Sequence, residues 1–140
     1  MILHPASVTF ADTPLDNVLT IAVERLAARE VVEFSDLGPH AAYADMPEIR
    51  TNIILVRRPS PPELTAVHPG DAGELVFTAA GGTSDAARVR VRVLCAVREV
   101  RYDFNDGGAG PGARATPRQM LTFIALSPDG APDPIVIEPI

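Results

Sequence analysis

Residues 88–104 read RVRVRVLCAVREVRYDF, and the chain returns at residues 120–126 as MLTFIAL. In the first stretch an apolar side chain recurs at every second position: Val89, Val91, Val93, Cys95 and Val97. A period of two is typical of a strand, whose successive side chains point to opposite faces. We expect the valine face of this strand to pack in the core and its arginine face to lie on the surface. Together the two stretches predict a long antiparallel hairpin.

The apolar positions change parity within the first stretch. Val100, Tyr102 and Phe104 continue the alternation, but they lie an odd number of residues after Val97. A slip of one residue exchanges the two faces of a strand. To keep these side chains inward, the strand needs a bulge near Arg98 and Glu99, or a bend onto a second sheet.

The rest of the chain alternates short β-prone stretches with Gly- and Pro-rich turns. Further strands are expected at residues 2–10, 52–56, 74–79 and 135–137. We find no internal repeat and no interdomain linker, and 140 residues suit one core. The order strand after strand predicts a mainly β, single-domain fold over residues 1–140, a β-sandwich or small barrel with at most one short helix.

Residues 14–28 fit two structures. Thr13 before Pro14 is typical of a helix start, and Val18, Ile21, Ala22 and Leu26 would share one helical face. Leu19, Ile21 and Val23 also alternate with less apolar residues, as a strand requires. We favour the strand, because Val31, Val32 and Phe34 stay β-prone after a charged turn at Arg29 and Glu30. The helix remains the alternative.

Two segments are predicted as extended loops. Residues 35–49 contain Gly38, Pro39 and Pro47 among polar residues, and residues 105–116 are rich in glycine. The second connects the two strands of the hairpin and is longer than a tight turn needs. Both are natural arms for contact with another molecule.

Composition excludes several classes of function. The formal net charge of −6 argues against a general nucleic-acid binder, which usually presents a basic face. The single cysteine, Cys95, excludes an internal disulfide and a thiolate metal cluster. No stretch approaches the roughly 20 apolar residues of a membrane helix, and Met1–Pro5 lacks the features of a signal peptide, so we expect a soluble chain.

No recognisable catalytic, metal or cofactor site is present in the sequence. Gly107 and Gly112 superficially resemble a phosphate-binding loop, but Ala113 and Arg114 follow where Lys and Ser or Thr are required. The calcium-loop spacing also fails after Asp103. Cys95 on the valine face is expected to be buried and inert. The three histidines lie in separate segments without metal-binding spacing. We therefore predict that the protein is not an enzyme and has no cofactor.

The arginine face supports two interpretations. Arg88, Arg90 and Arg92, continued by Arg98 and Arg101, form a basic row on an acidic protein. Such a row is either a solvated outer face or one half of an interface, where arginines of one copy meet carboxylates of the next. The interface hypothesis includes two residues of the glycine-rich loop and assigns these positions: Arg88, Arg90, Arg92, Arg98, Asp106 and Arg114.

Three stretches resemble a known family in their order and spacing. They are residues 7–25, SVTFADTPLDNVLTIAVER; residues 73–79 with 88–104, GELVFTA and RVRVRVLCAVREVRYDF; and residues 118–130, RQMLTFIALSPDG. Their layout is similar to that of small phage tail tube proteins and, more loosely, of type VI secretion tube subunits. The resemblance rests on layout, without an invariant motif.

The resemblance implies an architectural function. It predicts a β-barrel subunit that self-assembles into hexameric rings, which stack into a conduit for DNA in a virion tail. It implies synthesis in the host cytoplasm, other tail proteins as partners and DNA only as passing cargo, with no membrane partner. Related barrels serve as neck, baseplate or tail-completion proteins, so these remain alternatives. A monomeric β module that binds a small ligand or peptide is the alternative from another class.

Overall fold

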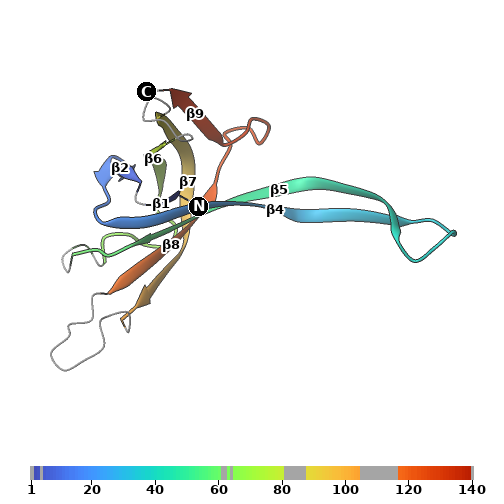
Figure 1. Ribbon diagram of the computed structural model, residues 1–140, viewed down its shortest axis with the longest axis horizontal. Coiled ribbons are helices and arrows are strands. Elements are labelled where there is room, and N and C mark those ends of the chain that lie inside the picture. Colours follow the sequence, from blue (N-terminus) through green and yellow to red (C-terminus); the bar gives the residue numbers. More distant parts are fainter. Residues whose placement is uncertain are drawn as a thin grey trace.

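The computed structural model describes residues 2–3, 5–60, 63, 65–80, 88–104 and 117–139, and these residues are almost entirely β-structure (Figure 1). They contain no α-helix. The mainly β prediction is therefore confirmed. The strands are β1 (Ile2–Leu3), β2 (Ala6–Phe10), β3 (Thr13–Pro14), β4 (Val18–Phe34), β5 (Ala41–Arg57), β6 (Ala72–Ala80), β7 (Arg88–Asp103), β8 (Arg118–Ala125) and β9 (Ile135–Pro139).

All strands belong to one antiparallel sheet, in the order β1-β4-β5-β8-β7-β6-β2-β3. β9 also pairs with β7, through residues Val89 to Val93. One edge of β7 therefore carries β9 along its first half and β8 along its second half, while β6 pairs with the other edge. β7 is thus the strand on which three others align.

The predicted hairpin is confirmed in β7 and β8. Their register changes between Val97 and Glu99, which is the bulge expected from the change of parity. Val91, Val93 and Cys95 are buried on the inner face, as predicted. The inward prediction is wrong for Phe104, which is exposed and stacks on Tyr102 with ring centroids 6.0 Å apart.

The sheet is strongly curled, although it is open and does not close into the predicted barrel. Phe10 of β2 and Phe123 of β8 are three strand spacings apart in the sheet, about 14 Å in a flat sheet. Their ring centroids are nevertheless only 5.0 Å apart. β3 lies at one end of the sheet and β4 near the other, and only residues 15–17 connect them. Because this connection is so short, the two ends of the sheet must approach each other.

The curl encloses an aliphatic core with three phenylalanines. Leu75 and Phe77 of β6, predicted on one face, are fully buried there. The other buried apolar side chains come from every long strand and from two connections: Val8, Phe10, Leu15, Val18, Ile21, Ile53, Leu55, Val67, Val91, Val93, Cys95, Val97, Leu121 and Phe123. The core lies between the facing parts of one sheet, much as it would lie between the two layers of a sandwich.

β4 and β5 form a hairpin that extends far beyond this core (Figure 1). The strand interpretation of residues 18–28 is confirmed. The turn predicted at Arg29 and Glu30 is wrong, because β4 passes through them with register shifts on either side. The extended loop predicted at 35–49 is wrong for residues 41–49, which belong to β5, while residues 35–40 lie between the two strands. Pro47 fits there because β5 has no second neighbouring strand at that position among the described residues.

We predict that Phe123→Ala lowers the free energy of unfolding by about 3–5 kcal/mol, because the ring is fully buried against Phe10. Phe104→Ala removes the same atoms from an exposed side chain and should cost less than about 1 kcal/mol. Urea unfolding of both variants, followed by far-UV circular dichroism, measures the difference. Equal losses would contradict the core described above.

Candidate assembly surfaces

The β4–β5 hairpin continues beyond the body as an arm, which we define as residues 23–50. Every residue of this segment is exposed. β1 pairs with β4 only at Thr20 and Ile21, and β8 pairs with β5 only from Asn52 onward. The arm is therefore a two-stranded ribbon whose outer edges have no neighbour in the described part of the chain. Such a ribbon is at best marginally stable in water, and its open edges invite pairing.

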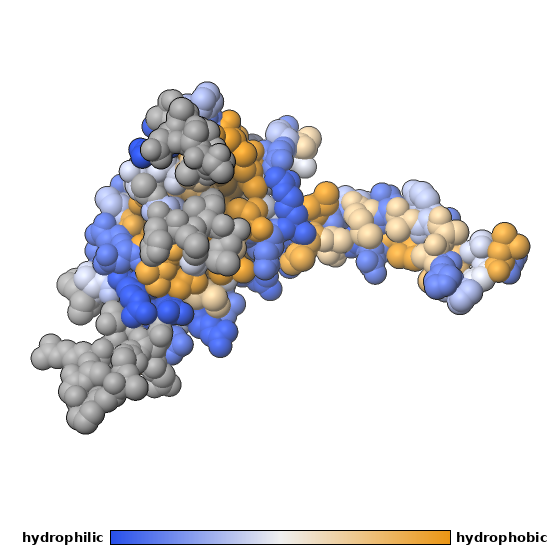
Figure 2. Space-filling view, viewed as in Figure 1, coloured by the Kyte–Doolittle hydropathy of each residue, from blue (hydrophilic) through white to orange (hydrophobic). Residues whose placement is uncertain are grey.

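The arm carries much of the exposed apolar surface of the described residues (Figure 2). Leu37 at the turn is 96% exposed, and Phe34 beside it is 66% exposed. Scattered apolar side chains are normal on a surface, but a run of them along one thin ribbon indicates a contact surface. The exposed large apolar residues of the arm are Val23, Leu26, Val31, Val32, Phe34, Leu37, Tyr43, Met46 and Ile49.

The outer part of the arm is also acidic. Between residues 30 and 48, which we call the arm tip, there is no Lys or Arg. The same segment holds five carboxylates: Glu30, Glu33, Asp36, Asp45 and Glu48. Glu48 lies 3.7 Å from Arg29, and both side chains are mostly exposed. An exposed ion pair such as this one contributes little to stability. The tip therefore presents both negative charge and exposed apolar side chains to its surroundings.

The base of the arm is tied to the connection between β8 and β9. Arg25 donates hydrogen bonds to both carboxylate oxygens of Asp133, at 3.0 and 2.9 Å. The backbone N–H of Ile135 also donates to Asp133, and these hydrogen bonds, the one from Ile135 first, lower the pKa of the Asp133 carboxyl. Between the arm and residues 130–134 lies an open groove of about 440 Å³, lined by Pro47 and Ile49 among others. These contacts support the arm where it leaves the body.

The arginine row predicted on β7 lies on the outer face of the sheet. Arg88 and Arg90 are exposed and form no hydrogen bond or ion pair with described residues. Arg92 is different, because it donates to Glu74 at 2.8 Å and lies 3.8 Å from Glu138. The hydrogen bond and the charge of Glu74, then the charge of Glu138, raise the Arg92 pKa. Two of the three cations are thus available to an external partner.

The remaining predicted interface residues lie apart from this group. Arg98 is exposed at the bulge, beside the half of β7 that pairs with β8. Asp106 and Arg114, with the predicted loop 105–116, lie outside the described residues. The arm itself was missed as a hairpin, although Gly38 and Pro39 between two β-prone stretches were a usable turn signal.

Arg57 is a buried cation that the sequence did not reveal. Its side chain is 1% exposed, its Nε donates to Gln119 at 2.7 Å, and its Nη1 lies 3.4 Å from a Glu63 carboxylate oxygen. Burial lowers the pKa of the guanidinium, and the charges of Glu63 and Asp16 oppose that shift. A buried cation needs such partners to offset its lost hydration. The sequence marked this residue only as the end of a strand.

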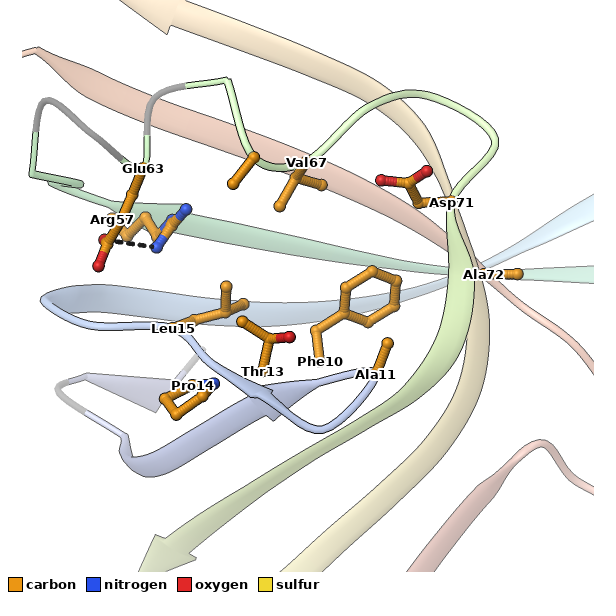
Figure 3. Close-up of a pocket in the computed structure, with 11 residues that line it drawn as sticks. Phe10, Ala11, Thr13, Pro14, Leu15, Arg57, Glu63, Val67, Asp71 and Ala72 are labelled. Carbon is orange, nitrogen blue, oxygen red and sulfur yellow. Dashed lines mark hydrogen bonds and ion pairs between the residues drawn. The ribbon is translucent and has the colours of Figure 1, made fainter.

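Arg57 borders a cavity of about 290 Å³ under the β2–β3 turn (Figure 3). Phe10, Leu15 and Val67 contribute apolar walls, and Asp71 lies at the rim. Figure 3 shows Arg57 directed toward Glu63, with their ion pair drawn. Because the guanidinium is engaged with protein partners, it is poorly placed to bind an anion. The cavity is close in size to a small-ligand site, but its charged groups are already engaged, Arg57 with Glu63 and Asp71 with the backbone N–H of His68.

No metal-binding cluster appears in the described ranges. No group of three or more His, Cys, Asp or Glu side chains there could hold a metal ion. Cys95 is fully buried, and burial raises the pKa of its thiol to about 12. No helix among the described residues is long and apolar enough to cross a membrane.

We predict that Cys95 is nearly unreactive toward iodoacetamide at about pH 8 in the folded protein, because the reactive thiolate is scarce and the sulfur is inaccessible. Modification should be at least about 100-fold slower than in urea, since it requires opening of the core. Mass spectrometry of timed samples measures both rates. Comparable rates with and without urea would show that the valine face of β7 is not sealed.

Comparison with known protein families and with curated proteins finds no match for this sequence. The arm and the arginines of β7 are its most distinctive features, and both are typical of contact surfaces for other macromolecules.

Proposed function

We propose that the protein is a structural subunit that assembles with copies of itself through its arm. The assembly is a closed ring, and the rings stack into a tube of the phage tail type. The observation that carries this proposal is the fully exposed arm of residues 23–50, which places a long apolar ribbon outside the core.

The stability of the arm supports an assembled state. In the isolated subunit, the arm has cross-strand hydrogen bonds but no core of its own. Burial of apolar surface contributes roughly 25 cal/mol per Å², and a neighbour that covers the arm would supply this contribution. The subunit is therefore expected to gain order and stability when a partner covers the ribbon.

Charge supports a second copy as the partner, in a head-to-tail arrangement. Two acidic arm tips would repel each other, so a symmetric tip-to-tip contact is unfavourable. The same chain carries Arg88 and Arg90 exposed on its body. A contact between two different surfaces of identical subunits forms a ring when its rotation closes, and a filament when it does not.

The tube form of the assembly rests on the resemblance to tail tube proteins. In this proposal six subunits close a ring in a virion tail, after synthesis in the host cytoplasm. Other tail proteins contact its ends, and DNA passes through without specific binding. The net charge of −6 suits a conduit for DNA, because like charge disfavours adhesion. The subunit has no catalytic role. A neck, baseplate or tail-completion subunit would use the same mode of assembly.

A monomeric ligand- or peptide-binding module is the second candidate. The cavity beside Arg57 is the observation in its favour. The engagement of the cavity's charged groups with protein partners is the observation against it. The two candidates differ in oligomeric state, which is directly measurable.

We predict that Phe34→Ser combined with Tyr43→Ser weakens self-association by about tenfold or more, because aromatic side chains dominate interface energies. Both residues are exposed on the arm, so the fold should be unaffected. Multi-angle light scattering over a concentration series gives the association, and negative-stain microscopy gives the form of the assembly.

The matched control is Phe104→Ser combined with Ile137→Ser, two similarly exposed side chains away from the arm. This control should assemble like the natural chain. A natural chain that stays monomeric at the highest concentration reached would refute the proposed function and favour the ligand-binding module. Equal loss of assembly in variant and control would show that the arm has no special part in it.

A further inference from the structure

We infer that the arm tip of one subunit docks on the outer face of β6, β7 and β9 of a second copy. We call that surface the acceptor face and define it by Arg88, Arg90, Leu94, Val76 and Val136. The inference rests on the proposed function and deepens it, since it names the surface on which the arm docks. Its basis is the match of charge and apolar surface between the two regions.

Register places the acceptor residues on one face. In an antiparallel pair, residues directly opposite each other share a face of the sheet. Arg92 is opposite Val76 of β6 and Val136 of β9, so these three share the outer face. Arg88, Arg90 and Leu94 lie at even spacing from Arg92 on β7 and therefore point the same way.

Within this face the free charges are positive. Glu74 and Glu138 interact with Arg92 and leave Arg88 and Arg90 without an ion pair in the described part of the chain. The arm tip holds five carboxylates and no Lys or Arg. Opposite charges at these two surfaces would guide encounter and set the register of docking.

The arm tip and the acceptor face also both expose apolar or aromatic side chains. Leu94 is 42% exposed and Val136 50% exposed, beside the two free arginines. The tip offers Phe34 and Tyr43, both more than half exposed. Arginine stacks favourably on aromatic rings, so the tip and the acceptor face would interact through charge and through ring contacts at once.

The tip belongs to a second copy because its own acceptor face is out of reach. The arm leaves the sheet from β4 and β5 and points away from β6, β7 and β9 (Figure 1). Its base is also held by Arg25 and Asp133. The other half of β7 is a less favourable docking surface for an acidic tip. There the carboxylates of Glu99 and Asp103 share the outer face with Arg101.

The experiment reverses charges on each side and then on both. Arg88→Glu with Arg90→Glu should weaken self-association about 10- to 100-fold, because two attractive contacts become repulsive. Adding Glu30→Arg with Glu33→Arg should restore most of the association, since each reversed pair is again opposite in charge. Arg98→Glu with Arg101→Glu is the matched control: it has the same change in net charge on the same strand, and it should assemble normally.

Light scattering over concentration measures association, and circular dichroism with urea unfolding checks that each variant is folded. If Arg88→Glu with Arg90→Glu unfolds, the neutral pair Arg88→Gln with Arg90→Gln replaces it, with a smaller expected loss. Recovery by the combined charge reversal supports the inference. Unchanged assembly in the β7 variant, no recovery in the combined variant, or an equal loss in the control would overturn it.

These failures differ from failure of the proposed function. If the acceptor-face variants assemble normally while Phe34→Ser with Tyr43→Ser does not, the arm assembles the protein through another seat. In that case the inference is wrong and the proposed function is still supported. If the natural chain is a monomer, both fall.

Discussion

The alternation of side chains along β7 is the constraint on which the structure depends. β7 pairs with β6 on one edge and with β8 and β9 on the other, so its register sets the faces of all three. Odd-numbered residues up to Val97 close the core, and the even-numbered arginines are left outside. One bulge before Glu99 shifts this pattern. Without it, the apolar residues of the second half would face water.

β5 shows how one strand can serve two environments. Its last residues, with Ile53 and Leu55, pair on both sides and are buried, whereas its first ten residues lie in the arm. The pairing with β4 runs from the core into the arm, with register shifts on the way, so the core orders the start of a ribbon that it does not cover. The body therefore sets the direction of the arm. The apolar side chains of the arm stay exposed to solvent unless another molecule packs on them.

The sequence predicted those elements whose pattern is local. The valine alternation, the bulge near Arg98 and Glu99, and the burial of Leu75 and Phe77 all follow from side-chain period and parity, and all are present. The arm was not predicted in the same way, because residues 41–49 form a strand through pairing with β4 and show no clear alternation of their own. Gly38 and Pro39 before this segment, and Pro47 within it, favoured a loop. Of the two partners of Arg57, Gln119 is remote in sequence, whereas Glu63 lies only six residues away.

The pairing of β5 with β8 has a mechanical consequence. Six consecutive residues, Asn52 to Arg57, are registered against β8, and the same strand runs on into the arm. A pull along the arm is therefore directed along β5 and loads these pairs together in shear, instead of opening them one after another. If neighbouring subunits hold one another by their arms, tension along such an assembly would reach each core through β5 and be shared by its six pairs with β8.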